Sequence, residues 1–167
     1  MGRLDGKVAV ITGGNSGVGA ATAKLFAKEG ATVVITARRE AALKEVADEI
    51  TAAGGEVYAV STDISKPEDP EALMQKVMDK YGKIDILVNN AGLIKRQDAI
   101  DFTEENWDSV IQVNEKMVFF LSQAFAKQLI KQGEGGKIIN VCSMLSYQGG
   151  IRVPSYTASK SAIIGLT

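Results

Sequence analysis

Short runs rich in valine and isoleucine alternate with longer segments of helical periodicity along this chain. The apolar runs cover residues 8–12, 32–37, 57–61, 84–89 and 137–142. Helical patterns cover residues 17–29, 40–53, 70–81 and 103–114, the last continuing into 116–132. Near-continuous apolar strands joined through helices predict a parallel sheet covered on both faces, in an α/β fold. Right-handed crossovers then give the strand order 3-2-1-4-5, with a ligand crevice at the carboxyl edge between the first and fourth strands.

A glycine-rich turn follows the first apolar run. It reads Thr12-Gly13-Gly14-Asn15-Ser16-Gly17-Val18-Gly19, and a helical pattern begins within it. Gly13 would allow a tight turn, Gly17 would let the backbone approach a pyrophosphate, and Gly19 would let the helix pack closely on the strand. The free amides and the macrodipole at the start of that helix favour phosphate. An isolated string of this kind could be only a turn, but its position between strand and helix favours a dinucleotide site.

Near the other end of the sequence, Tyr156 is followed four residues later by Lys160. Residues at this spacing lie on one face of a helix, a turn apart. There the ammonium favours the phenolate form, which would make the tyrosine usable as a base near neutral pH. Taken alone, the pair could equally be an ordinary exposed pair on a helix.

The composition excludes several classes of function. The chain has 167 residues, is 46% hydrophobic and balances 19 basic against 20 acidic residues, which predicts a single globular domain over 1–167 with no nucleic-acid partner. No stretch is long enough for a membrane span and the start lacks a signal-peptide core, so the cytoplasm is the expected location. Histidine is absent and Cys142 is the single cysteine, which argues against histidine-dependent nucleophiles and against a metal site.

Together, these motifs resemble those of the short-chain dehydrogenase/reductase family. The resemblance rests on Thr12 to Gly19, on Asn89-Asn90-Ala91-Gly92 after the fourth strand, and on Ser143 with Tyr156 and Lys160. It implies a Rossmann-type, doubly wound NAD(P)-binding domain. Family members usually continue with further strands and a substrate lid, so the resemblance also implies a fold truncated before its last strands, lacking the C-terminal third.

The resemblance assigns roles to four residues. Tyr156 would be the catalytic acid/base, and Lys160 would support it and hydrogen-bond the nicotinamide ribose. Ser143 would hold the substrate oxygen, since its hydroxyl can donate to developing negative charge. Asn114 matches the asparagine that positions a water in the family's proton relay. On their own, Ser143 could be a strand-end turn residue and Asn114 a cap at a helix junction.

The residue types at the end of the predicted second strand indicate which of the two dinucleotides, NAD or NADP, is the cofactor. Family members that use NAD tend to carry an acidic residue there, which accepts hydrogen bonds from the ribose 2′-OH. This chain has Ala37 instead, followed by Arg38 and Arg39. A missing carboxylate removes repulsion against a 2′-phosphate, and Arg38 offers a planar donor for it. NADP is therefore favoured over NAD, although both arginines could be merely solvated.

Further cofactor contacts are implied by position in the family pattern. Asp63, followed by Ile64, matches the aspartate that contacts adenine, although it could equally be an ordinary N-terminal helix cap. Asn90, Ala91 and Gly92 should line the adenosine ribose.

From Asn89 onward the resemblance narrows to family members that act on sugar acids of the 2-dehydro-3-deoxy-gluconate type. Those members are generally described with NAD, so this likeness and the Ala37-Arg38 pattern favour different cofactors. A sugar acid needs a cation for its carboxylate, and Arg96 and Arg152 lie in loops leading to the site, whereas Lys95 fits a solvated charge better. The expected substrate contacts are Ser143, Arg96, Gln148, Arg152 and Tyr156.

The predicted function is hydride transfer between NADP(H) or NAD(H) and a secondary alcohol or ketone of a small sugar acid. A catalytically incompetent dinucleotide-binding fragment is one alternative, and a 3-oxoacyl or steroid-type reductase is another. The partner expected is a small-molecule substrate, with a homo-oligomer for the full-length family member. If the sheet ends at residues 137–142, that run becomes an edge strand prone to self-association.

Overall fold

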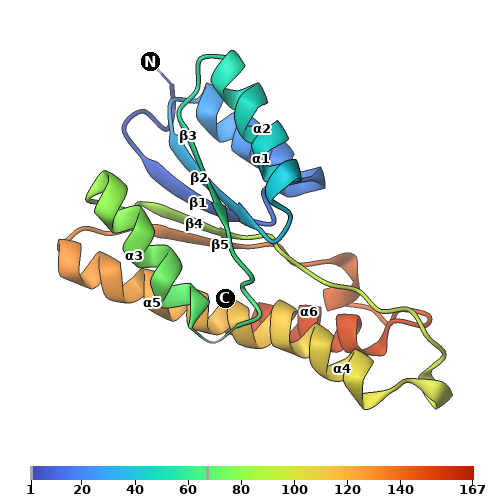
Figure 1. The fold of residues 1–167 in the computed structure, drawn as a ribbon. Coiled ribbons are helices and arrows are strands. Elements are labelled where there is room, and N and C mark those ends of the chain that lie inside the picture. Colours follow the sequence, from blue (N-terminus) through green and yellow to red (C-terminus); the bar gives the residue numbers. More distant parts are fainter. Residues whose placement is uncertain (1, 67) are drawn as a thin grey trace.

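The computed structural model describes residues 2–66 and 68–167 and contains a parallel five-stranded sheet in the order β3-β2-β1-β4-β5 (Figure 1). This order confirms the prediction, and β5 lies at one edge. The strands are β1 Val8–Thr12, β2 Thr32–Ala37, β3 Val57–Ser61, β4 Ile86–Asn89 and β5 Lys137–Asn140.

Helices cover both faces of the sheet at its centre, so that every residue of β1 is buried. On one face, α1 (Gly17–Lys28) and α2 (Glu40–Ala52) pack on Ala9 and Ile11 of β1. On the other, α3 (Asp69–Tyr81) and α5 (Met117–Gln132) pack on Val8 and Val10. This alternation follows from the strand period of two, which sends neighbouring side chains to opposite faces.

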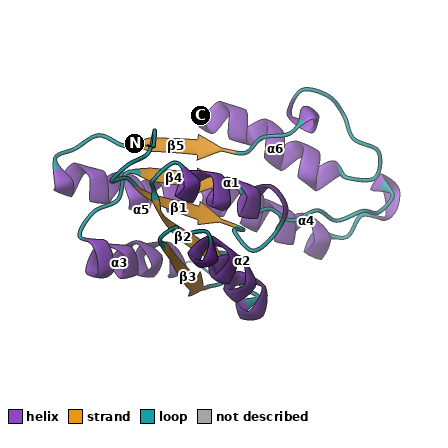
Figure 2. Ribbon diagram, turned by 90° about the horizontal axis from the view of Figure 1, so that it is seen from above, coloured by secondary structure: helices purple, strands orange, loops and turns teal. Residues whose placement is uncertain are grey.

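Two further helices extend past the carboxyl edge of the sheet. The helices α4 (Glu104–Ile111) and α6 (Pro154–Leu166) pack against each other there (Figure 2). The carboxyl end of α6 returns to β5, where Asn140 Nδ2 donates a hydrogen bond of 3.0 Å to Thr167 Oγ1. Short turns complete the fold: η1 (Ala99–Asp101), the π-helix η2 (Gln112–Lys116) and η3 (Met144–Ser146).

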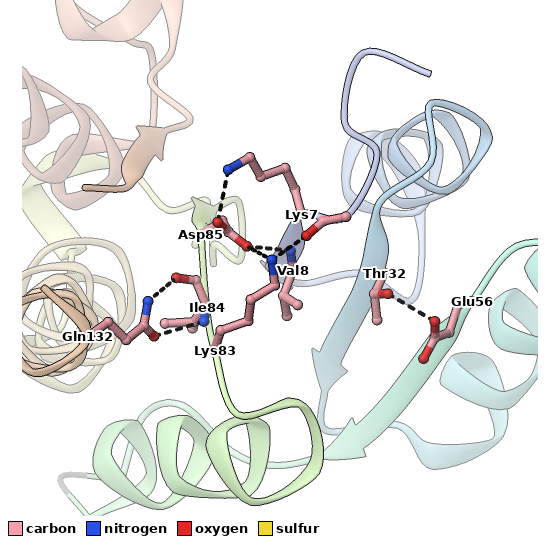
Figure 3. Close-up of polar contacts among 9 residues, drawn as sticks. Lys7, Val8, Thr32, Glu56, Lys83, Ile84, Asp85 and Gln132 are labelled. Carbon is pink, nitrogen blue, oxygen red and sulfur yellow. Dashed lines mark hydrogen bonds and ion pairs between the residues drawn. The ribbon is translucent and has the colours of Figure 1, made fainter. Parts of the chain in front are cut away.

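A polar network fixes the amino edge of the sheet (Figure 3). Asp85 is 5% exposed, and its carboxylate accepts hydrogen bonds from the Val8 amide at 2.8 Å and Lys7 Nζ at 3.1 Å. The Gln132 side chain binds both backbone groups of Ile84, at 2.9 and 3.0 Å. These contacts tie β1, β4 and α5 together at the edge opposite the crevice, and so set the register of the strands that carry the crevice loops.

The structure departs from the sequence prediction by one residue at several helix ends and more clearly at the features that follow. The fourth strand begins at Ile86 rather than at residue 84, and the fifth ends at Asn140 rather than at residue 142. The helix expected over 103–132 is divided by the π-helix η2, which periodicity alone does not reveal.

Within the described part of the chain, every helix is too short or too polar to cross a membrane.

Candidate functional site

A cleft of about 550 Å³ opens at the carboxyl edge of the sheet, where the crevice was predicted. It is bounded by the loops that follow the first four strands, and by α4 and η2 on the far side. This volume is within the range of small-molecule sites. The lining residues are Gly13, Asn15, Ser16, Thr36, Ala37, Arg38, Arg39, Thr62, Asp63, Ile64, Ser65, Asn90, Ala91, Gly92, Leu93, Ser109, Gln112 and Val113.

The glycine turn forms one wall of this cleft. Gly13 has φ +66°, and a Cβ there would lie 2.9 Å from Nδ2 of the Asn90 side chain. A Cβ on Gly19 would overlap the Gly13 carbonyl, whereas Gly17, with φ +52°, faces open space. Gly13 and Gly19 therefore permit the tight turn and the close packing. Gly17 is not among the described residues that line the cleft, and its contact with a phosphate at the amino end of α1 stays a prediction. Val18, on the same turn, is exposed and does not line the cleft.

Thr12 joins this turn to the loop after β4. Its hydroxyl accepts hydrogen bonds from the backbone amides of Asn90 at 3.1 Å and Ala91 at 3.0 Å, and donates to the Val88 carbonyl at 3.3 Å. Asn90 Nδ2 donates in turn to the Thr12 carbonyl at 3.0 Å. The two loops on either side of the crevice are thus one hydrogen-bonded unit, which sequence reasoning did not identify.

The other end of the cleft carries the residues expected at the adenosine. Arg38 and Arg39 lie exposed after β2, and Asp63 lies opposite them after β3. Partial burial acts to raise the pKa of Asp63, but hydrogen bonds from the Ser65 hydroxyl and amide, with the charges of Arg38 and Lys66, hold it below its usual value. An ionised acceptor and guanidinium donors therefore face one space, which fits an adenosine carrying a phosphate.

Thr36 adds a further sign that the cleft fits a polar ligand. It lines the cleft, is fully buried, and its hydroxyl has no hydrogen-bond partner among the described residues. Buried hydroxyls are normally satisfied, so this one leaves unused hydrogen-bonding capacity beside the cleft. The residues present fit a dinucleotide.

The π-helix η2 places two amide side chains beside the site: Gln112 lines the cleft, whereas Asn114 is not among the described residues that line either cavity. Asn114 is fully buried; its Oδ1 accepts from the Leu93 amide at 2.7 Å, and its Nδ2 donates to the Leu93 carbonyl at 2.8 Å and to Ser159 Oγ at 3.2 Å. Asn114 therefore fixes the loop after β4 against α6, and its place in a water relay stays a prediction. Gln112, which the sequence analysis missed, donates from Nε2 to the Ser65 carbonyl at 2.9 Å.

A second cavity of about 290 Å³ contains the tyrosine–lysine pair. Lys160 Nζ lies 5.8 Å from the centre of the Tyr156 ring, so the predicted helical face exists on α6. Lys160 is 5% exposed and donates to the Val141 carbonyl at 2.6 Å. Burial lowers the pKa of its ammonium group, against the opposing effect of the nearby Cys142 thiol. The cavity is lined by Asn90, Gly92, Leu93, Ile94, Val141, Cys142, Tyr156 and Lys160, the first three of which also line the larger cleft.

Ser143 occupies the turn that leads from β5 to α6. Its hydroxyl accepts from the Leu145 amide at 3.2 Å, while the Ser146 hydroxyl accepts from the Ser143 amide at 3.2 Å and donates to the Lys160 carbonyl at 2.7 Å. Ser143 thus caps η3, in line with the strand-end turn interpretation, and it is not among the described residues that line the second cavity. Its contact with substrate stays a prediction.

The structure does not bring the loop residues proposed for substrate binding into either cavity. Arg96 and Gln148 are exposed, and Arg152 Nε forms an ion pair of 2.7 Å with Asp98. The Arg152 carbonyl accepts from the Gln97 amide at 3.0 Å, and Arg152 has φ +62°, an unusual value for a residue with a side chain. Arg152 therefore links two loops, and its role toward a substrate carboxylate stays a prediction.

Several known proteins are similar to this chain in sequence. It is 52% identical over 98% of its length to a 2-dehydro-3-deoxy-D-gluconate 5-dehydrogenase of Dickeya dadantii, and 40% identical over 99% to a 3-oxoacyl-(acyl-carrier-protein) reductase of Thermotoga maritima. The chain spans 64% of the first relative and 67% of the second.

A crystal structure from Agrobacterium tumefaciens, provisionally described as a 2-deoxy-D-gluconate 3-dehydrogenase with bound NADP, has a TM-score of 0.88 and 48% identity. This likeness covers 98% of the chain and 64% of that structure. The family model for short-chain dehydrogenases matches residues 7–167, and the chain therefore belongs to the short-chain dehydrogenase family.

Proposed function

We propose that this chain carries the dinucleotide site and the acid–base pair of an NADP-dependent oxidoreductase acting on a secondary alcohol or ketone of a small sugar acid. The main support for the proposal is that two cavities adjoin each other and share the lining residues Asn90, Gly92 and Leu93. One cavity fits a dinucleotide and the other holds Tyr156 and Lys160. A reacting carbon placed where they join would be close to both.

The cofactor would lie along the larger cleft. Its pyrophosphate fits beside Gly13 to Ser16 at the amino end of α1, and its adenosine fits between Arg38 and Asp63. When bound, NADP supplies the hydride acceptor or donor. The preference for NADP over NAD rests on Ala37 and Arg38, and the relative from Agrobacterium tumefaciens has NADP bound.

Tyr156 would transfer the proton in this reaction. Its hydroxyl would give a proton to the carbonyl oxygen during reduction, and its phenolate would take one from the alcohol during oxidation. The Lys160 ammonium, held in place by the Val141 carbonyl, supplies positive charge beside the ring.

The sugar-acid class is supported by the identity of 52% with the gluconate dehydrogenase, against 40% with the acyl reductase. A second candidate is a dinucleotide-binding unit without turnover. It is favoured by the exposure of Ile138 and Ile139 on β5 and of Leu166 on α6, which leaves the elements that hold the second cavity partly uncovered.

Turnover and binding assays distinguish these candidates. Purified chain is mixed with NADP+ or NAD+ and 2-dehydro-3-deoxy-D-gluconate, and dinucleotide reduction is followed by absorbance. Titration calorimetry measures NADP+ affinity on the same sample. Turnover preferring NADP+ supports the enzyme, binding without turnover supports the second candidate, and the absence of both contradicts the proposed function.

A further inference from the structure

The π-helical turn Gln112–Lys116 presents two amide side chains to two different loops of the cleft. Residues two positions apart in a helix point in different directions. Accordingly, Asn114 reaches Leu93 after β4, whereas Gln112 Nε2 reaches the Ser65 carbonyl after β3 across 2.9 Å. π-Helices are rare, and those that exist are often found at functional sites. The extra residue in the turn changes the direction of the side chains that follow.

The loop held by Gln112 carries the predicted adenine contact. Ser65 donates to Asp63 Oδ1 from its amide at 3.1 Å and from its hydroxyl at 2.8 Å. At the other end of the loop, Asp69 Oδ2 accepts from Thr62 Oγ1 at 2.8 Å and from the Asp63 amide at 3.0 Å. Asp63 is thus placed by two anchors, Asp69 in α3 and Gln112 in η2.

The chemistry of glutamine suits this second anchor. Ser65 and Gln112 both line the cleft, where the phosphates of a dinucleotide bring negative charge. A primary amide donates to the Ser65 carbonyl without adding charge, whereas a carboxylate would repel both that carbonyl and the phosphates. At the other end of the loop, the Thr62 amide also donates to the Ala37 carbonyl at 3.1 Å, so Gln112 is the anchor at the Ser65 end.

We propose that Gln112 is a positioning residue that holds the loop 62–65, and with it Asp63, in place for the adenosine half of the dinucleotide. This inference rests on the proposed function, because it assigns the adenosine to that end of the cleft. Gln112 and Asn114 together make η2 a bridge between the adenosine and nicotinamide sides of the site.

The test compares Gln112→Met with the unaltered chain, using Gln123→Met as the matched control. Methionine keeps the length of the side chain but removes the donor, and Gln123 is an exposed residue of α5 away from the cleft lining. Titration calorimetry with 2′,5′-ADP and with NADP+ measures affinity. Amide NMR shifts of Ser65 and Leu93 report the two loops separately.

Gln112→Met should weaken both ligands about three- to tenfold, the range for loss of one hydrogen bond. The Ser65 amide should shift, the Leu93 amide should not, and the thermal midpoint should stay close to that of Gln123→Met. Unchanged affinity, or a Ser65 amide that does not move, would overturn the positioning role and leave the proposed cofactor site intact. Failure of the unaltered chain to bind either ligand would overturn the cofactor site and this inference with it.

Discussion

Lys160 donates its ammonium hydrogen bond to the Val141 carbonyl, with 2.6 Å between Nζ and O. Val141 is the first residue after β5, so this contact joins the helix that carries Tyr156 to the carboxyl edge of the sheet. Because Lys160 is 5% exposed, its position is fixed by packing as well as by this bond. The sheet thus holds the Lys160 ammonium group in place. The position of Tyr156, four residues earlier, follows from the helix α6 that carries both residues.

Tyr156→Phe should remove turnover while leaving dinucleotide affinity within about twofold, because only the proton donor is lost. The measurement is steady-state kinetics, with calorimetric titration of NADP+, on a full-length version of the protein. Retention of more than about a tenth of the activity would show that Tyr156 is not the acid/base.

Arg38→Ala should weaken NADP+ binding by about 1–3 kcal/mol and NAD+ binding far less, because a charge-assisted contact to the 2′-phosphate is lost. The two dinucleotides are titrated in parallel into the chain and into the variant, so NAD+ serves as the internal control. Equal losses for both would favour NAD and contradict the phosphate contact.

Asp85→Asn should destabilise the fold by about 1–3 kcal/mol at pH 7, because the amide nitrogen would face the Val8 N–H or Lys7 in place of an acceptor. Burial acts to raise the pKa of Asp85, but the Val8 amide and the charges of Lys7 and Lys83 hold it below the ordinary value of 3.8. A carboxyl with a lowered pKa stabilises the fold above its unfolded pKa and loses that contribution as the pH falls through its folded pKa.

The difference in unfolding free energy between the chain and Asp85→Asn should therefore be constant near neutral pH and shrink only below 3.8. Urea denaturation at several pH values measures it. A difference that grows on acidification would contradict this account.

The exposed edge of β5 should make the isolated chain self-associate. Ile138 is 39% and Ile139 43% exposed on this strand, and its outer backbone groups have no neighbouring strand among the described residues. Edge strands of this kind pair with other chains, and a lysine blocks such pairing.

Ile138→Lys should reduce the association seen by light scattering. Ile130→Lys is the control, since Ile130 is 80% exposed but lies on α5. An unaltered chain that stays a monomer at the same concentration would contradict the expectation.

The sequence determined the features that depend on local periodicity and on backbone geometry. Alternating apolar runs and helical patterns specify a parallel sheet, and the crossover rule leaves the observed order β3-β2-β1-β4-β5. The conformation of Gly13 and the shared face of Tyr156 and Lys160 follow from residue type and a spacing of one helical turn. Such features need no knowledge of distant partners.

Only the tertiary structure decided which partner each polar side chain takes. Arg152 pairs with Asp98, Ser143 caps its own turn, and Gln112 reaches Ser65, 47 positions away in the sequence. A polar group in a loop has many possible partners of similar strength, and the docking of helices and strands elsewhere determines which one comes within reach. The π-helix η2, which directs Gln112 and Asn114 and contacts α6, was likewise not predictable, because its residues carry no periodic signal of their own.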